Sequence, residues 1–130
     1  MFDTPHKIKK ILIAEDDVNI RLLTQQMLEA FDYQTIAVEN GLEAWNLLEK
    51  EEFDLVLTDI MMPVLSGTDL VKRIRESKNY LLPIIVVSGS HVELFNTMEI
   101  GNTKTLAKPF QLETLIRLIQ SFETHIVVPA

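Results

Sequence analysis

Cysteine is absent from the 130-residue chain, which excludes disulfide bonds and thiolate metal sites. Long hydrophobic runs are also missing, because the longest, LLPIIVV, is far shorter than the roughly 20 apolar residues of a membrane-spanning helix. Positive charge is scarce: 12 Lys and Arg against 19 Asp and Glu give a net charge of −7, which disfavours direct binding of nucleic acid. The content of 47% hydrophobic and 24% charged residues is typical of a globular protein, and the length suits one domain. We therefore expect a single cytoplasmic domain that has neither nucleic acid nor membrane as a partner.

Apolar segments alternate with amphipathic segments five times along the chain. The apolar segments are rich in β-branched residues and predict strands at 8–14, 33–38, 54–58, 83–87 and 104–107. Helical periodicity predicts helices at 17–31, 40–50, 67–76, 91–100 and 110–122, the fourth being the weakest. Strands that are apolar throughout indicate a parallel sheet covered on both faces. The expected fold is α/β: a doubly wound, five-stranded parallel sheet of strand order 2-1-3-4-5 flanked by five helices, a flavodoxin-like three-layer sandwich.

The domain is expected to span residues 8–122, with an N-terminal extension at 1–7 and a C-terminal tail at 123–130. On the first predicted helix, Ile20, Leu23, Met27 and Phe31 share one face. Apolar residues at this spacing are typical of one face of an amphipathic helix.

Polar and charged residues stand where the predicted strands end, which is where open parallel sheets bind ligands. These residues are an acidic run, a single acid, a hydroxyl and an ammonium: Glu15-Asp16-Asp17, Asp59, Ser88 and Lys108. Two like charges ~4 Å apart repel by roughly 4 kcal/mol at an effective dielectric of ~20, so crowded carboxylates indicate a bound cation. Oxygen ligands without cysteine or clustered histidine suit Mg²⁺, or Mn²⁺, rather than zinc. An acid, a metal, a hydroxyl and an ammonium together describe an aspartate that accepts a phosphoryl group.

Four segments, ILIAEDD, DLVLTDIMMPVLSG, PIIVVSGS and LAKPF, follow one another over residues 8–122 and together resemble the receiver domain of bacterial response regulators, of the single-receiver chemotaxis type. The resemblance implies that Asp59 takes a phosphoryl group from a histidine kinase or a histidine phosphotransfer protein. The chain would then be a switch of a two-component pathway rather than an enzyme, and it would control a downstream protein or a dimer partner.

The resemblance also implies which residues hold the metal ion. Asp16 would bind Mg²⁺ directly, and Glu15 would act through water or hydrogen bonds. Asp59 itself and the backbone carbonyl of Met61 would complete the protein ligands.

A second set of residues is implied for the phosphoryl group. Ser88 would contact its oxygens and Lys108 would pair with it, and the Lys108–Pro109 peptide would be cis, a geometry open to proline. Thr105 departs from the family, which usually has Tyr or Phe there, and its small, stiff side chain cannot serve as an aromatic switch. Because the stretch between Ser88 and Lys108 is also shorter than usual, we expect the segment 90–104 to reorder instead.

Access of water to an acylphosphate at Asp59 should depend on two neighbours, Met61 and Ser90. Met61 has an apolar body and only a weak thioether acceptor, so the acylphosphate is expected to be long-lived.

Three other functions were weighed against this one. A flavodoxin-type electron carrier needs a Gly/Ser/Thr phosphate loop after the first strand, but here that loop is acidic. A haloacid dehalogenase-type hydrolase usually carries a second Asp two residues after its nucleophile, where this chain has Met61. The serious alternative is a receiver-like docking module that is never phosphorylated.

Overall fold

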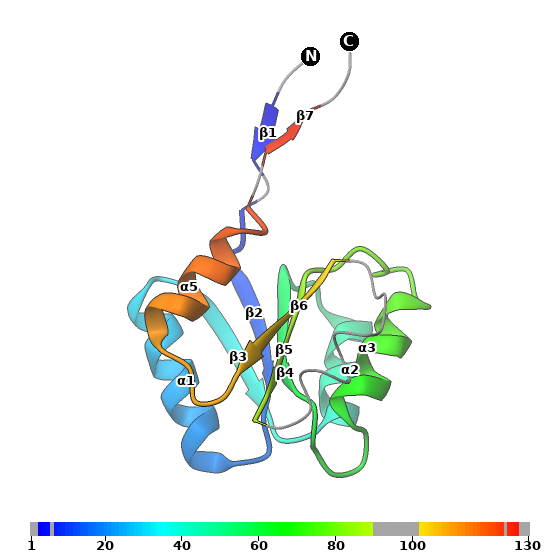
Figure 1. Ribbon diagram of the computed structural model, residues 1–130. Helices are drawn as coiled ribbons and strands as arrows, with labels where there is room; N and C mark the ends of the chain where they lie inside the picture. The colour runs from blue at the N-terminus through cyan, green and yellow to red at the C-terminus, as the bar shows by residue number, and fades with distance from the viewer. Residues whose placement is uncertain (1–2, 6, 90–101, 124, 128–130) are drawn as a thin grey trace.

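The computed structural model describes residues 3–5, 7–89, 102–123 and 125–127, and its centre is a five-stranded parallel sheet (Figure 1). The sheet is built from β2 (Lys10–Ala14), β3 (Gln34–Val38), β4 (Leu55–Asp59), β5 (Ile84–Ser88) and β6 (Thr103–Ala107). Their order across the sheet is β3-β2-β4-β5-β6, and every pairing is parallel. The predicted order 2-1-3-4-5 is therefore confirmed.

Helices cover both faces of this sheet (Figure 1). α1 (Val18–Ala30) and α5 (Leu112–Gln120) pack on one face, and α2 (Gly41–Lys50) and α3 (Gly67–Arg75) on the other. The structure describes these four helices, which confirms the three-layer fold. The helix predicted at 91–100 lies outside the described residues. Within the described ranges, no helix has the length and apolar character needed to cross a membrane.

Alternation of side chains along each strand divides the core into two halves. In β2, Ile11 and Ile13 belong to the core half under α1 and α5, whereas Leu12 and Ala14 belong to the half under α2 and α3. All four are essentially inaccessible to solvent. Burial of each large aliphatic side chain contributes about 1.5–3 kcal/mol, so the uninterrupted apolar strands account for much of the stability of the sandwich.

The buried face of α1 differs from the face that the four apolar residues share. Leu23 and Phe31 are 55% and 51% exposed, and the buried residues of the helix are Thr24 and Leu28. The helix is apolar on more than one side, so helical periodicity places the helix without selecting its core face. Ile20, Leu23 and Met27 instead line a surface groove near the site described below.

Two short segments, one near each end of the chain, lie side by side. β1 (Asp3–Pro5) and β7 (His125–Val127) pair as a small antiparallel sheet beyond the start of β2 (Figure 1). Next to it, the backbone N–H of Ile8 donates to Oε2 of Glu123 at 2.8 Å. The predicted extension and tail therefore contain residues that pair with each other, which no local pattern in either segment indicated.

The loop between β4 and α3 contains a strained turn at Val64. The N–H of Leu65 donates to the carbonyl of Pro63 at 2.8 Å, and Val64 between them has a φ of 69°. These features define a γ-turn of the rare, strained kind, and a positive φ is especially unfavourable for a β-branched residue. The loop ends in a close backbone contact that only glycine permits, because a Cβ on Gly67 would lie only 1.9 Å from the carbonyl oxygen of Asp59.

The strain predicts that Val64→Asn stabilises the protein. Val64 is 74% exposed, so little burial is lost, and relief of the backbone strain should raise the free energy of unfolding by about 1 kcal/mol. Urea denaturation measures this change. The control is Val18→Asn, at an exposed residue that begins α1, which should change stability by less than about 0.5 kcal/mol. Equal changes in the two variants, or a loss at Val64, would contradict the prediction.

Candidate functional site

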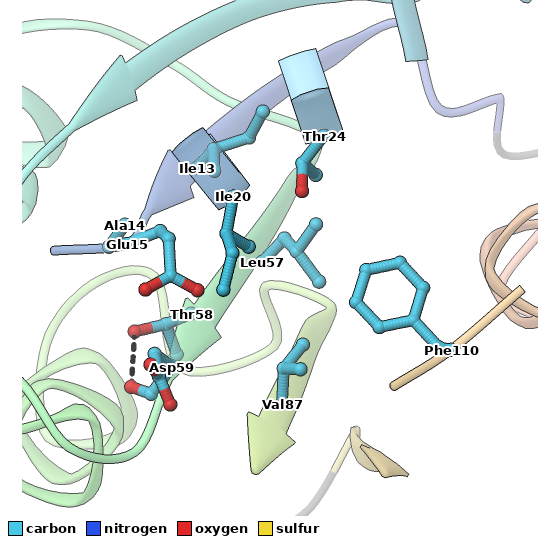
Figure 2. Close-up of a pocket in the computed structure, with 10 residues that line it drawn as sticks. All are labelled: Ile13, Ala14, Glu15, Ile20, Thr24, Leu57, Thr58, Asp59, Val87 and Phe110. Carbon is cyan, nitrogen blue, oxygen red and sulfur yellow. Dashed lines mark hydrogen bonds between the residues drawn. The ribbon is translucent and has the colours of Figure 1, made fainter. Parts of the chain in front are cut away.

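Three carboxylates meet at the carboxyl ends of β2 and β4, which are neighbours in the sheet. Glu15 and Asp16 follow β2, Asp59 ends β4, and one oxygen from each lies within 4.8 Å of the others. The side chains of Glu15 and Asp59 are only 7% and 11% exposed, whereas Asp16 is exposed. Figure 2 shows the Glu15 carboxylate turned toward Thr58 and Asp59. The structure thus brings together the three acids that the sequence analysis grouped.

Lys108 bridges two of these acids. Its Nζ donates to Oε1 of Glu15 at 2.8 Å and to Oδ2 of Asp59 at 2.9 Å. Lys108 follows β6, two strands away from β4, and a long lysine side chain spans that distance. Burial lowers the pKa of Lys108, but its hydrogen bonds and its attraction to the two carboxylates outweigh burial and leave the pKa raised. The ammonium is therefore charged at neutral pH.

The ionised form of Glu15 is disfavoured by burial and by repulsion from Asp59, and Lys108 offsets this only in part. Burial raises the pKa of Glu15, while hydrogen bonds from Lys108 and from the backbone N–H of Asp17 lower it. Repulsion from Asp59 adds to the upward direction, and the pKa stays raised. The ionised cluster is thus short of positive charge.

Asp17, the third acid of the run, has a different task. Its Oδ1 accepts from the N–H groups of Asn19 and Ile20 at 2.9 and 3.1 Å, so it is the N-cap of α1. Adjacent acids therefore divide between helix capping and the cluster. The side-chain chemistry alone could not assign them, because either task suits an aspartate.

Ser88 and Lys108, the residues predicted to bind the phosphoryl group, also lie at the carboxyl ends of the strands. Ser88 is buried at the end of β5, and its carbonyl accepts from the N–H of Lys108 at 3.0 Å. The Lys108–Pro109 peptide is cis, as the resemblance implied. Thr105 lies half-buried within β6, paired with Val86.

The two residues expected to control water access differ in what the structure describes. Met61 is 61% exposed, in the loop that follows Asp59. Ser90 lies outside the described residues, as does most of the segment 90–104.

An apolar groove of ≈ 340 Å³ lies between α1 and the loop that follows β6, next to the acid cluster. It is lined by Ile20, Leu23, Thr24, Met27, Lys108, Pro109 and Phe110. Lys108 belongs to both the groove and the cluster. Beneath the carboxylates is a separate cavity of only ≈ 10 Å³, and Figure 2 shows Phe110 on its far side. No sequence pattern identified the groove. The only indication was that α1 carries more apolar surface than its contact with the core requires.

The donor set fits a hard divalent cation. All three clustered side chains offer carboxylate oxygen, the ligand type that Mg²⁺ and Mn²⁺ prefer. Three carboxylates and the Lys108 ammonium sum to a charge of −2 when all are ionised. A divalent cation would balance this charge.

The parallel sheet of this order, with acids after its central strands and a lysine after its edge strand, defines a class of phosphoacceptor signalling domains. The chain belongs to the response regulator receiver domain family, whose model matches residues 11–120.

Two curated relatives illustrate the range of proteins that contain such a domain. Sporulation initiation phosphotransferase F of Bacillus subtilis is 30% identical over 115 residues, which cover 88% of this chain and 93% of that protein. The 3',5'-cyclic-nucleotide phosphodiesterase regA of Dictyostelium discoideum is 36% identical over 124 residues, but the match covers 91% of this chain and only 16% of the phosphodiesterase. The chain also spans half or less of several other relatives, so its likeness to those proteins concerns one domain.

Solved structures agree with this assignment. The chemotaxis response regulator CheY4 of Vibrio cholerae matches with a TM-score of 0.79 at 30% identity, covering 88% of this chain and 98% of that one. The receiver domain of sensor histidine kinase PA1611 from Pseudomonas aeruginosa matches with a TM-score of 0.80 at 28% identity, covering 88% and 97%. That structure has a magnesium ion coordinated in its active-site cleft.

Proposed function

We propose that this chain is a phosphoacceptor switch of a two-component pathway, with Asp59 as the phosphorylated residue and Mg²⁺ as the cofactor. The observation that carries the proposal is the position of Lys108, whose ammonium contacts both Asp59 and Glu15 at the edge of the sheet where the acids cluster. A partly buried ammonium beside a nearly buried carboxylate suits transfer of a phosphoryl group, since it can pair with the incoming anion. A docking module that is never phosphorylated would have no need for this arrangement.

The proposed reaction is transfer from a phosphohistidine. An oxygen of Asp59 attacks phosphorus, the P–O bond forms, the P–N bond breaks and its electron pair stays on the imidazole nitrogen. Lys108 pairs with an oxygen of the transferred group, and the Ser88 hydroxyl donates to another. When bound by Asp16, Glu15, Asp59 and the Met61 carbonyl, Mg²⁺ supplies neutralisation of the charge on the phosphoryl oxygens. The chain takes part in a single transfer and then acts as a switch, not as an enzyme of many turnovers.

The apolar groove beside Lys108 suits the protein that donates the phosphoryl group. Asp59 is 11% exposed, so a donor histidine reaches it only if the donor covers the rim of the site. On the α1 side that rim is the groove, where Leu23 and Met27 offer apolar surface. We assign this surface to a cytoplasmic histidine kinase or histidine phosphotransfer protein. The downstream partner is a protein or a second copy of the chain.

Phosphorylation of Asp59 is tested by intact mass after treatment with acetyl phosphate. The wild type should gain one phosphoryl group when Mg²⁺ is present and none when the ion is removed with a chelator. Asp59→Asn should gain none, because the amide is not a nucleophile of comparable strength. The matched control is Asp69→Asn, an exposed acid on α3, which should be labelled like the wild type. Labelling that persists in Asp59→Asn would reject Asp59 as the acceptor.

Lifetime of the acylphosphate is tested at Met61. Met61→Asn should speed hydrolysis severalfold, because an amide can orient a water molecule that a thioether cannot. The rate is measured as loss of phosphoryl mass after acetyl phosphate is removed. Val64→Asn places the same amide elsewhere in the loop and serves as the control, with no change expected. An unchanged rate in Met61→Asn would mean that Met61 does not shield the phosphoryl group.

Docking on the groove is tested by comparing a protein donor with a small one. Leu23→Asp places a charge on the groove and should slow transfer from autophosphorylated histidine kinases by roughly tenfold or more, the effect of about 1.4 kcal/mol in binding. Labelling by acetyl phosphate should not change. The control is Leu22→Asp, an exposed neighbour on α1 that does not line the groove. A panel of kinases is screened with the wild type first, and equal transfer to Leu23→Asp would reject the groove.

A further inference from the structure

Arg21 reaches back from α1 to the backbone of the acidic run. Its Nη1 donates to the carbonyl oxygen of Glu15 at 2.8 Å and to that of Asp16 at 3.4 Å. Arg21 is partly buried, and within the described part of the chain it forms no ion pair with a carboxylate. The guanidinium is thus committed to two peptide carbonyls beside the cluster.

The location of this cation is unfavourable for the helix itself. Arg21 lies in the second turn of α1 and its side chain extends toward the N-terminal end, where the helix dipole is positive. The first turn of α1 contains no acidic residue, so the negative charge at this end comes from the N-cap Asp17 and the rest of the acidic run. Contacts with the acidic run therefore favour the observed conformation of the Arg21 side chain. We accordingly expect Arg21 to affect the acidic run rather than the helix.

Asp16 is the member of the cluster that depends on such support. Glu15 is held by Lys108 and by the N–H of Asp17, and Asp59 is held by Lys108. Among the described residues, no hydrogen bond or ion pair holds the Asp16 carboxylate. Its direction is consequently set by its backbone, and the two carbonyls that Arg21 binds belong to the peptide groups on either side of Asp16.

We propose that Arg21 is a positioning residue that orients Asp16 toward Asp59 and thereby sets the affinity for Mg²⁺. The inference rests on the proposed phosphoacceptor function only for its effect on labelling; its effect on metal affinity is independent. One nitrogen of the guanidinium donates to both carbonyls; a lysine ammonium keeps the charge, but its shorter side chain should weaken these contacts.

The test compares Arg21→Met and Arg21→Lys with the wild type in calorimetric titrations with Mg²⁺. Loss of a group that orients a metal ligand typically costs 10–100-fold in affinity, so Arg21→Met should raise the Kd for Mg²⁺ roughly tenfold and Arg21→Lys by less. The rate of labelling by acetyl phosphate should fall at low Mg²⁺ and return to the wild-type rate at saturating Mg²⁺. Arg117→Met, at an exposed arginine on α5, is the control and should leave both quantities unchanged.

Several outcomes would overturn the proposal. A lower melting temperature with an unchanged Kd for Mg²⁺ would mean that Arg21 only stabilises α1. A labelling rate that stays low at saturating Mg²⁺ with an unchanged Kd would mean that Arg21 acts on transfer itself. If Arg21→Met does not fold, Arg21→Lys decides, and a wild-type Kd in that variant rejects the inference. A wild type that binds Mg²⁺ but is never labelled would reject the phosphoacceptor function while leaving the comparison of Kd values valid.

Discussion

Repulsion between Glu15 and Asp59, relieved in part by the single ammonium of Lys108, is the constraint on which the site depends. Both acids are nearly buried, and the partly exposed Lys108 contacts each of them within 2.9 Å. The pKa of Glu15 nevertheless stays raised, first because the carboxyl is buried and then because Asp59 repels it. The folded protein without a cation therefore retains a destabilising concentration of negative charge. A divalent cation at the three carboxylates would offset this deficit of positive charge.

Only the topology of the sheet makes this constraint possible. Glu15 and Lys108 are 93 residues apart in sequence, and they meet because β2, β4, β5 and β6 are parallel and end at one edge. Helices on both faces bury the strands, which excludes water from beneath the acids and strengthens every interaction among them. The strained turn at Val64 belongs to the same edge, because Gly67 packs against the carbonyl of Asp59. Backbone strain and charge repulsion are thus both concentrated around Asp59.

The sequence predicted those features that depend on periodicity and on position along the chain. Continuous apolar runs located the five strands, and parallel pairing then required the acids and Lys108 to share an edge. The sequence could not distinguish between residues of the same chemical type in neighbouring positions. α1 is apolar on more than one side, so only packing against the sheet selects Thr24 and Leu28 as its buried residues. Likewise Asp16 and Asp17 are chemically identical, and only the direction in which α1 starts makes Asp17 the cap.

At the opposite end of the sheet, where the strands begin, an arginine side chain forms hydrogen bonds to neutral groups. This contrast between the two ends indicates where conformational change can occur. Arg75 donates at 2.8 to 3.0 Å to the carbonyls of Tyr80, Leu82 and Asn102 and to Oγ1 of Thr103. Burial lowers its pKa to about 10, so it remains charged at neutral pH and keeps these bonds. These bonds join the end of α3 to the start of β6, and no carboxylate competes for them within the described residues. A change in charge at Asp59 therefore meets a strained and charge-unbalanced end of the sheet on its own side, whereas the other end is held by hydrogen bonds to neutral groups. The carboxyl-end loops, rather than the far end of the sandwich, are the part of the fold that phosphorylation can rearrange at the lowest free-energy cost.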